Sequence, residues 1–258
     1  SASKSSWPWP DARWLRKLSS KYDFPILAPT NSNFSDVAFL RRLRQEFQPS
    51  MILNCYGLVK LPLEFLTIAD IAVNYHNGKL PQYRGVRATN LSLYHGESTT
   101  GFTFHHMTEG LDEGAVLIEG EIPVASGENV FDLEHLKAKS AAGCFPELLE
   151  AMVRKDAGRP QQGAPGFFSR RAWQRIRSIA EPHHMVSDEI YRRLKAFSVL
   201  KIWIDGQWYD VSGLALSERE SDLRRFRSSD GVWLRPTRYG FLPYYLYAPI
   251  RRRVWKDR

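Results

Sequence analysis

Short apolar runs alternate with amphipathic stretches between residues 11 and 155, and this alternation limits the fold more than any other feature of the sequence. Strands are predicted for the apolar runs, which are residues 24–29, 49–57, 71–76, 100–107 and 115–124. Helices are predicted for the stretches with helical spacing, which are residues 11–22, 35–47, 88–97 and 128–155. Alternating strands and helices are typical of βαβ units, so the sequence predicts an α/β fold with a mostly parallel sheet.

Glycine and proline predict where these elements end. Gly96 ends the helix of residues 88–97, and Pro146 bends or interrupts the helix of residues 128–155. Gly, Pro and Gln gather just after residue 155, which is typical of a domain boundary. The predicted division is a core at residues 11–155, a linker at 156–166 and a small mixed C-terminal domain at 167–258. In that domain, Asp205-Gly206 between alternating runs predicts a hairpin.

The formal net charge of +8 favours anionic partners, and much of the excess lies in the C-terminal tail. Cys55 and Cys144 lie in apolar runs and are predicted to be buried thiols in a reducing compartment. No apolar run approaches the ~20 residues that a membrane span needs. The opening residues lack the apolar segment of a signal peptide. The sequence therefore predicts a cytoplasmic protein.

Asn74 and His76 lie at the end of a predicted strand. Residues two apart on a strand point to the same face, and the carboxyl ends of parallel strands face the ligand crevice. There an amide can donate to a developing oxyanion and an imidazole can move a proton near neutral pH. Asp112, in the loop after the strand of residues 100–107, is predicted to complete the set for acyl transfer to an amine. The alternative is that Asn74 and His76 are polar groups that only cap the loop.

Five ordered motifs extend this pattern, and together they resemble the core of the folate-dependent formyltransferases. They are Asn-x-His at Asn74 and His76, LPQYRG at residues 80–85, HGE at 95–97, TGFT at 100–103 and GLDEG at 110–114. This family includes methionyl-tRNA formyltransferase, glycinamide ribonucleotide formyltransferase and the amino-sugar N-formyltransferases. The resemblance covers about residues 20–155 and implies a Rossmann-like core.

The resemblance also implies a chemistry for these residues, with 10-formyltetrahydrofolate as the formyl donor. Asn74 would hold the formyl oxygen, His76 would act as acid or base, and Asp112 would keep His76 charged or relay the amine proton. The residues implied to bind the folate are Gly57, Leu58, Val59, Leu61, Met107, Thr108, Glu109 and Gly110. The residues implied to bind the amine acceptor are Lys79, Tyr83 and Arg84.

The chain departs from the family pattern at two places. The family begins with a strand, a Gly-rich turn, a helix and a second strand, and we expect this N-terminal βαβ unit to be absent here. Residues 77–79 read Asn-Gly-Lys where many members have a Ser-Leu-Leu type sequence. Lys79 there either meets an anionic acceptor or is a solvated loop lysine.

Three functions stay open at the level of sequence. The first is formylation of a small amine acceptor that carries negative charge, most plausibly an amino sugar on a nucleotide or lipid carrier. The second is methionyl-tRNA formyltransferase, and the third is a non-catalytic folate- or ligand-binding descendant. Basic and aromatic residues mix along residues 224–256, which suits contact with tRNA, contact with a membrane surface, or a packed edge with a solvated tail. A homodimer is a further open alternative.

The sequence also contains two pairs of adjacent histidines. Adjacent His183 and His184 lack a further ligand nearby in the sequence, so no metal site is predicted. His105 and His106 end a predicted strand at the same crevice. We expect one of them to point into the site as support and the other to point away.

Overall fold

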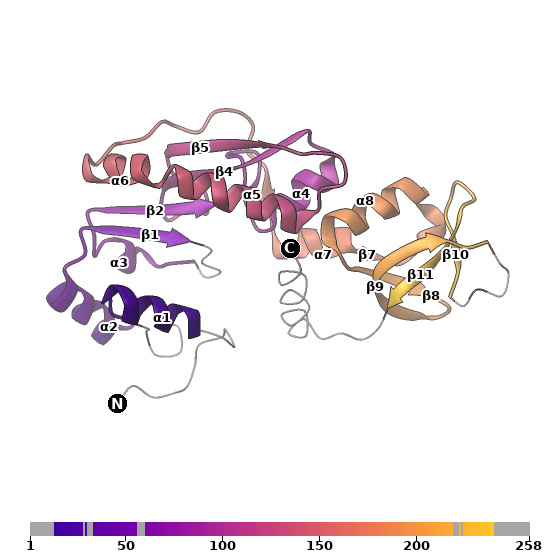
Figure 1. The fold of residues 1–258 in the computed structure, drawn as a ribbon, viewed down its shortest axis with the longest axis horizontal. Helices are drawn as coiled ribbons and strands as arrows, with labels where there is room; N and C mark the ends of the chain where they lie inside the picture. The colour runs from indigo at the N-terminus through magenta and orange to yellow at the C-terminus, as the bar shows by residue number, and fades with distance from the viewer. Residues whose placement is uncertain are drawn as a thin grey trace. The chain divides into compact units, whose positions relative to one another are not determined.

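The computed structural model describes residues 13–27, 29, 33–55, 60–218, 222 and 224–239. The chain divides into two units, Ser1–Val73 and Asn74–Arg258. Figure 1 shows the order of helices and strands along the chain. Within the described ranges, none of the helices combines the length and apolar character that crossing a bilayer would require.

The first unit is mainly helical. Its elements are α1 (Arg13–Tyr22), α2 (Val37–Arg42), the π-helical turn η2 (Leu43–Phe47), β1 (Met51–Cys55) and α3 (Leu63–Leu66). Asp36 caps α2, because its side chain accepts a hydrogen bond of 2.9 Å from the Phe39 amide. The strand predicted for residues 24–29 is wrong, since residues 24–27 belong to no strand. Pro25 has no N–H to donate to a neighbouring strand. Cys55 is exposed, against its predicted burial, and Cys144 is half-buried.

A four-stranded sheet with the order β1-β2-β4-β5 carries the predicted site. β2 (Ile71–His76) contains the boundary between the two units. β4 (Thr99–His106) and β5 (Val116–Pro123) pair antiparallel, so the sheet is mixed at this edge. The α/β class predicted from the sequence is confirmed.

Three helices of the second unit cover this part of the sheet or pack beside it. α4 (Ala88–His95) is buried along most of its length and contacts β4 and α5 (Val130–Gly143). Gly96, at a φ of 72°, ends α4 as predicted. α5 and α6 (Phe145–Val153) contact β5, and Pro146 lies in the first turn of α6, which confirms the predicted interruption.

The C-terminal part of the second unit is a five-stranded sheet with the order β10-β11-β9-β8-β7. These strands are β7 (Ser178–Ile179), β8 (Leu200–Ile204), β9 (Gln207–Leu216), β10 (Phe226–Arg227) and β11 (Trp233–Tyr239). Asp205 and Gly206 have φ values of 49° and 82° and form the predicted hairpin turn between β8 and β9. This sheet shares a hydrophobic core with α4, α5 and Ile122 of β5.

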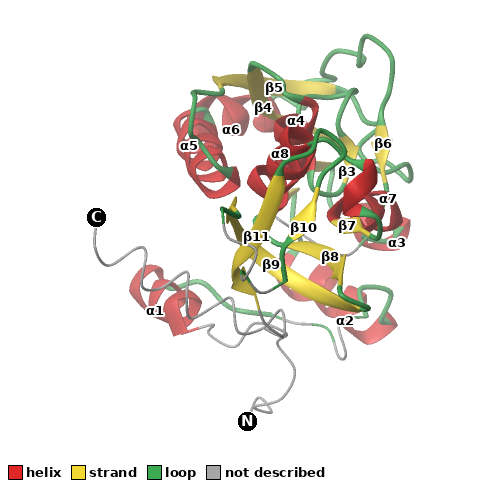
Figure 2. Ribbon diagram, turned by 90° about the vertical axis from the view of Figure 1, so that its right-hand side faces the viewer, coloured by secondary structure: helices red, strands yellow, loops and turns green. Residues whose placement is uncertain are grey.

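α8 (Ser187–Phe197) lies between two helices and the five-stranded sheet. It contacts α4 and α5 on one side and β8 and β9 on the other (Figure 2). The Asn90 side chain donates a 2.7 Å hydrogen bond to the Ala196 carbonyl, which ties α4 to α8. α7 (Arg170–Arg177) packs against α8, and the short turn η3 (Pro182–His184) lies between α7 and α8 in the chain.

The predicted linker, residues 156–166, is bound to the core along part of its length. Arg159 and Val116 exchange two backbone hydrogen bonds of 2.8 Å. The Gln161 amide donates to the carbonyl oxygens of Asp112 and Gly114 at 2.8 and 2.9 Å. Beyond it, β6 (Phe167–Phe168) pairs in parallel with β3 (Arg84–Gly85). The chain therefore passes the predicted site on its way to the C-terminal part.

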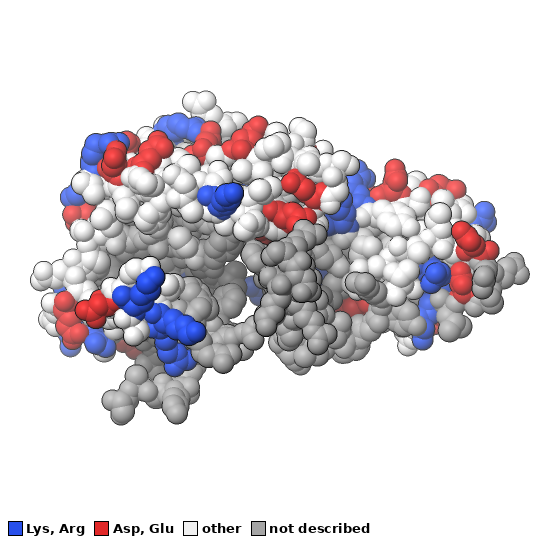
Figure 3. All heavy atoms as spheres, viewed as in Figure 1, with Lys and Arg blue, Asp and Glu red and all other residues white. Residues whose placement is uncertain are grey.

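Charges of both signs are interspersed on the surface of the second unit that β5 and α6 form (Figure 3). Arg159 pairs with Glu119, and Arg154 pairs with Glu150 at 3.7 Å. The net positive charge of the chain is therefore not concentrated on this surface. Residues 240–258, the greater part of the segment predicted to contact RNA or a membrane, lie outside the described residues.

Candidate functional site

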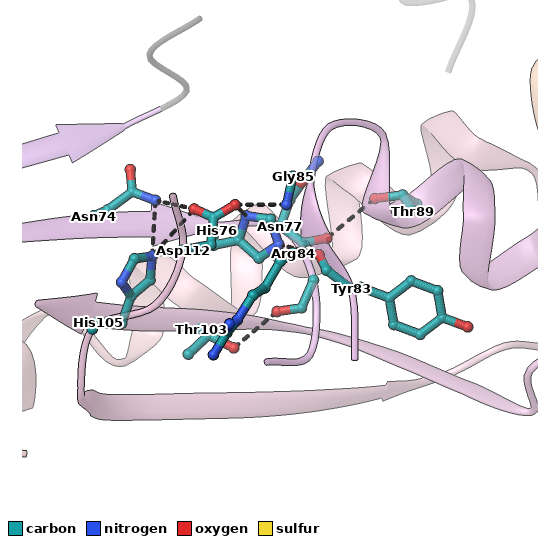
Figure 4. A network of polar contacts seen from close by, with 12 residues as sticks. Asn74, His76, Asn77, Tyr83, Arg84, Gly85, Thr89, Thr103, His105 and Asp112 are labelled. Carbon is teal, nitrogen blue, oxygen red and sulfur yellow. Dashed lines mark hydrogen bonds and ion pairs between the residues drawn. The ribbon is translucent and has the colours of Figure 1, made fainter. Parts of the chain in front are cut away.

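Asp112 lies between the two polar side chains at the end of β2. The Asn74 amide nitrogen lies 3.5 Å from Asp112 Oδ1, and His76 Nδ1 lies 3.5 Å from Asp112 Oδ2 (Figure 4). One carboxylate therefore faces the amide and the imidazole, as expected for residues two apart on a strand. His76 and Asp112 are 5% and 6% exposed, whereas Asn74 is half-buried. The three residues predicted to act together are therefore brought together.

The loop after β4 places Asp112 in an unusual backbone conformation. Asp112 has a φ of 56°, in the left-handed region. Its Oδ2 accepts a hydrogen bond of 2.7 Å from the Gly85 amide. Gly85 has a φ of 93°, and a Cβ there would collide with the Phe168 carbonyl. Only glycine lets β3 approach both the carboxylate and β6 in this way.

His105, on the neighbouring strand β4, holds the Asn74 amide. Its Nδ1 lies 2.8 Å from the His106 carbonyl, which only accepts, so Nδ1 carries the proton. In a neutral ring Nε2 then accepts from the Asn74 amide at 3.1 Å. Nε2 also faces Asp112 Oδ1 at 3.5 Å, an ion pair when the ring is protonated. His106 turns instead to the Asp156 carbonyl. One histidine of the pair thus points in and the other away, as predicted.

Burial decides the charge of His76. Burial lowers the pKa of the His76 imidazole, and the Asp112 carboxylate and the Tyr83 carbonyl raise it by less. His105 and Lys137 lower that pKa further. The net pKa lies below the ordinary value, so His76 is neutral at neutral pH. The expectation that Asp112 keeps His76 charged is wrong here, because desolvation of the imidazolium outweighs its attraction to the carboxylate.

Asp112 remains ionised beside this neutral ring. Burial alone raises the pKa of the Asp112 carboxyl, but a hydrogen bond from protonated His105, the charge of protonated His76 and the Gly85 amide hold it below its ordinary value. His76 Nε2 lies 2.6 Å from the Tyr83 carbonyl and must donate to it. Nδ1 of the neutral ring is then unprotonated and faces the carboxylate. A proton that arrives there is shared between an imidazole and a carboxylate, which suits a general base.

The predicted acceptor-binding residues all have protein partners. Lys79 Nζ contacts Glu121 at 2.5 Å and Thr99 at 3.2 Å. The Tyr83 hydroxyl donates to Glu97 at 2.7 Å, and burial together with this bond raises the pKa of that phenol. Arg84 donates to Gln161 at 2.7 and 3.1 Å. Contact of Lys79, Tyr83 and Arg84 with an acceptor stays a prediction.

The residues predicted to bind the folate fall into three groups. Gly57, Leu58 and Val59 lie outside the described residues, and Leu61 belongs to the first unit. The segment from Met107 to Gly110 follows β4 and is half-buried or exposed. Leu111, next to Asp112, is 42% exposed. An accessible segment and an open apolar side chain beside the carboxylate fit a pterin ring, and the individual contacts stay predictions.

One residue next to the site, Lys137, was not predicted from the sequence. Lys137 is fully buried and donates to the Asn77 carbonyl, one residue after His76. The sequence pattern that indicates its burial is its spacing on α5. Lys137 lies four residues from both Leu133 and Ala141, on the apolar stripe that faces the core. In the described part of the chain, no group of three His, Cys, Asp or Glu side chains is placed to hold a metal ion.

Comparisons with known proteins identify the family of the chain. The family described as Formyl transferase matches residues 21–149. GDP-perosamine N-formyltransferase of Brucella melitensis is 33% identical over 125 residues, which are 48% of this chain and 48% of that protein. Methionyl-tRNA formyltransferase of Syntrophus aciditrophicus is 35% identical over 116 residues, 45% of this chain and 36% of that protein.

Solved structures support the fold. A 4-N formyltransferase from Francisella tularensis superposes with a TM-score of 0.62 at 19% identity, over 78% of this chain and 82% of that one. The match to the curated relatives spans about half of their length or less. The family match covers half of this chain and includes Asn74, His76 and Asp112. The chain therefore belongs to the formyl transferase family.

Proposed function

We propose that the chain is an N-formyltransferase that moves a formyl group from 10-formyltetrahydrofolate to the primary amine of an amino sugar on a nucleotide or lipid carrier. The observation that carries this proposal is the meeting of Asn74, His76 and Asp112 around one buried carboxylate in a member of the formyl transferase family. Bound folate supplies the activated formyl carbon, and the side chains of this chain supply the oxyanion donor and the base.

The Asn74 amide is suited to hold the oxyanion that forms when the amine attacks the formyl carbon. One of its N–H groups is engaged by His105 at 3.1 Å, within the normal range for a hydrogen bond. The contact with Asp112 is 3.5 Å long and therefore weak. A developing oxyanion can take the place of Asp112 as the acceptor of the second N–H, while His105 keeps the amide in place.

His76 and Asp112 are suited to take the proton that the amine loses. The neutral His76 accepts it at Nδ1, and the resulting imidazolium faces Asp112 Oδ2. The bond between the formyl carbon and the folate nitrogen then breaks, and that nitrogen takes up one proton. The amine thus loses the proton that the folate gains, and the site returns to its starting charge.

One comparison favours an amino sugar over tRNA. The GDP-perosamine relative is matched over 48% of its length, against 36% for the tRNA relative. A nucleotide or lipid-phosphate carrier also suits a chain with a net charge of +8. Formylation of methionyl-tRNA is the second candidate, because its relatives reach a similar identity.

The test is formyl transfer followed by mass spectrometry. The protein is incubated with 10-formyltetrahydrofolate and GDP-perosamine, and separately with methionyl-tRNA, and the gain of one formyl group is recorded. Formylated sugar is the expected product. Formylated tRNA alone would establish the second candidate. Folate that raises the melting temperature without turnover on any amine would indicate a non-catalytic binder.

Two substitutions and a control link turnover to the site. Asn74→Ala removes the oxyanion donor, and a loss of about 10²- to 10³-fold in kcat is expected. His76→Ala removes the base, and a loss of about 10²- to 10⁴-fold is expected. His106→Ala changes a neighbouring histidine that turns away from the site, and its kcat should match the wild type. Wild-type turnover in either site variant would contradict the mechanism.

A further inference from the structure

Lys137 occupies a position in α5 where a lysine is rarely found. Its residue is 0% exposed, and Leu133 and Ala141, one turn away on either side, are also buried. Lysine is almost never fully buried unless its charge is paired or hydrogen-bonded, because the desolvation cost is high. The contacts of Lys137 therefore have to account for its place in the core.

These contacts converge on the backbone that follows His76. Lys137 Nζ donates to the Asn77 carbonyl at 2.9 Å and to the Thr89 hydroxyl at 3.0 Å. The Thr89 hydroxyl donates in turn to the same Asn77 carbonyl at 3.4 Å. The Asn77 side chain lies 3.4 Å from Glu134, one turn before Lys137 on α5. α5 thus holds Asn77 through both its main chain and its side chain.

The position of Asn77 matters because Asn77 is bonded directly to His76, where β2 ends. The His76 ring contacts the Tyr83 carbonyl and faces Asp112, and both lie in loops rather than in the sheet. Thr103 holds the next carbonyl, that of Gly78, at 2.8 Å. Without the Lys137 contact, the Asn77 carbonyl would lose its shortest hydrogen bond.

We propose that Lys137 is a positioning residue of the formyl-transfer site, which holds the backbone after His76 and keeps the His76 imidazole aligned with Asp112. This inference rests on the proposed function, and it assigns a part in that function to a residue of α5 that is not one of the reacting groups. Lys137 touches no substrate in this account. It acts only through Asn77 and through its charge.

The charge of Lys137 supplies a second line of support. The groups whose charges reach His76 are Asp112, His105 and Lys137, and of these Asp112 raises the pKa of His76 whereas the other two lower it. Glu134 is the acidic group that reaches Lys137 and favours its charged form. Removal of the ammonium should therefore raise the pKa of His76.

Kinetics test the positioning role. Lys137→Met keeps the length and apolar stem of the side chain but removes its donor and charge. We expect kcat to fall by about 10- to 100-fold with KM nearly unchanged, because a misplaced base slows the chemical step more than binding. The acid limb of the kcat/KM profile should move to higher pH. Lys139→Met alters an exposed lysine of the same helix, and its kinetics should match the wild type.

Titration of His76 by NMR tests the same inference without turnover. The His76 resonance, assigned by comparison with His76→Gln, should titrate at higher pH in Lys137→Met and near the wild-type pH in Lys137→Arg. Should Lys137→Met fail to fold, Lys137→Leu replaces it, since leucine also removes both the donor and the charge. Wild-type kcat and an unmoved His76 titration in the folded neutral variant would overturn the inference. Absence of formyl transfer in the wild type would instead overturn the proposed function and leave the titration valid.

Discussion

Replacement of Lys137 by Met should change how stability depends on pH. Burial lowers the pKa of Lys137 from 10.5 to about 7, and Glu134 opposes this shift by less. Between these two values the unfolded chain binds a proton that the folded chain does not hold. Folding is therefore disfavoured by this group at pH 7, and the free energy of unfolding rises as the pH increases towards 10.5.

The magnitude follows from the two pKa values. Each pKa unit corresponds to about 1.4 kcal/mol, so the group costs the folded state about 4 kcal/mol at pH 7 and about 2 kcal/mol at pH 9. The wild type should thus gain about 2 kcal/mol over this interval relative to Lys137→Met. The absolute difference at one pH is less informative. The variant also loses two hydrogen bonds, worth about 1–3 kcal/mol each for a charged donor.

Urea unfolding of both proteins at pH 7 and pH 9 provides the measurement. Other groups that titrate in this interval are shared by the two proteins and cancel in the difference. Lys139→Met, on the exposed side of α5, should follow the wild type. A difference between wild type and Lys137→Met that stays constant from pH 7 to pH 9 would refute the reasoning, since Lys137 would then keep an ordinary pKa.

Three further predictions concern the site. Asp112→Asn removes the charge that raises the pKa of His76, so the acid limb of the pH–rate profile should move to lower pH. The value of kcat should also fall. An unchanged profile would show that Asp112 takes no part in the proton transfer. His105→Ala should lower kcat by about tenfold or more, because the Asn74 amide loses its hydrogen-bond partner. His106→Ala should leave kcat unchanged, because His106 bonds the Asp156 carbonyl instead. Equal kcat values in the two variants would show that His105 does not hold Asn74. Gly85→Ala forces a Cβ against the Phe168 carbonyl at a φ of 93°. The free energy of unfolding, measured by thermal unfolding, should fall by about 1–3 kcal/mol. An unchanged melting temperature would mean that β3 and β6 can separate without cost.

Most of the element order could be predicted from the sequence, because it depends on local periodicity and on chain breakers. The strands of residues 71–76 and 100–107, the end of α4 at Gly96 and the interruption at Pro146 follow from residues within one or two turns. The strand prediction for residues 24–29 was wrong because hydrophobicity alone does not provide a neighbouring strand to pair with. The antiparallel pairing of β4 with β5 likewise depends on the connection between them and not on either strand's composition.

The sequence by itself determined that an amide and an imidazole share one face of a strand, because side chains alternate along any strand. Only the tertiary structure decided what surrounds them. Asp112 reaches them across 36 and 38 residues of chain, and Lys137 reaches Asn77 across 60. Whether His76 is charged depends on how completely these contacts exclude water, and desolvation is a property of the packed state that no local pattern records.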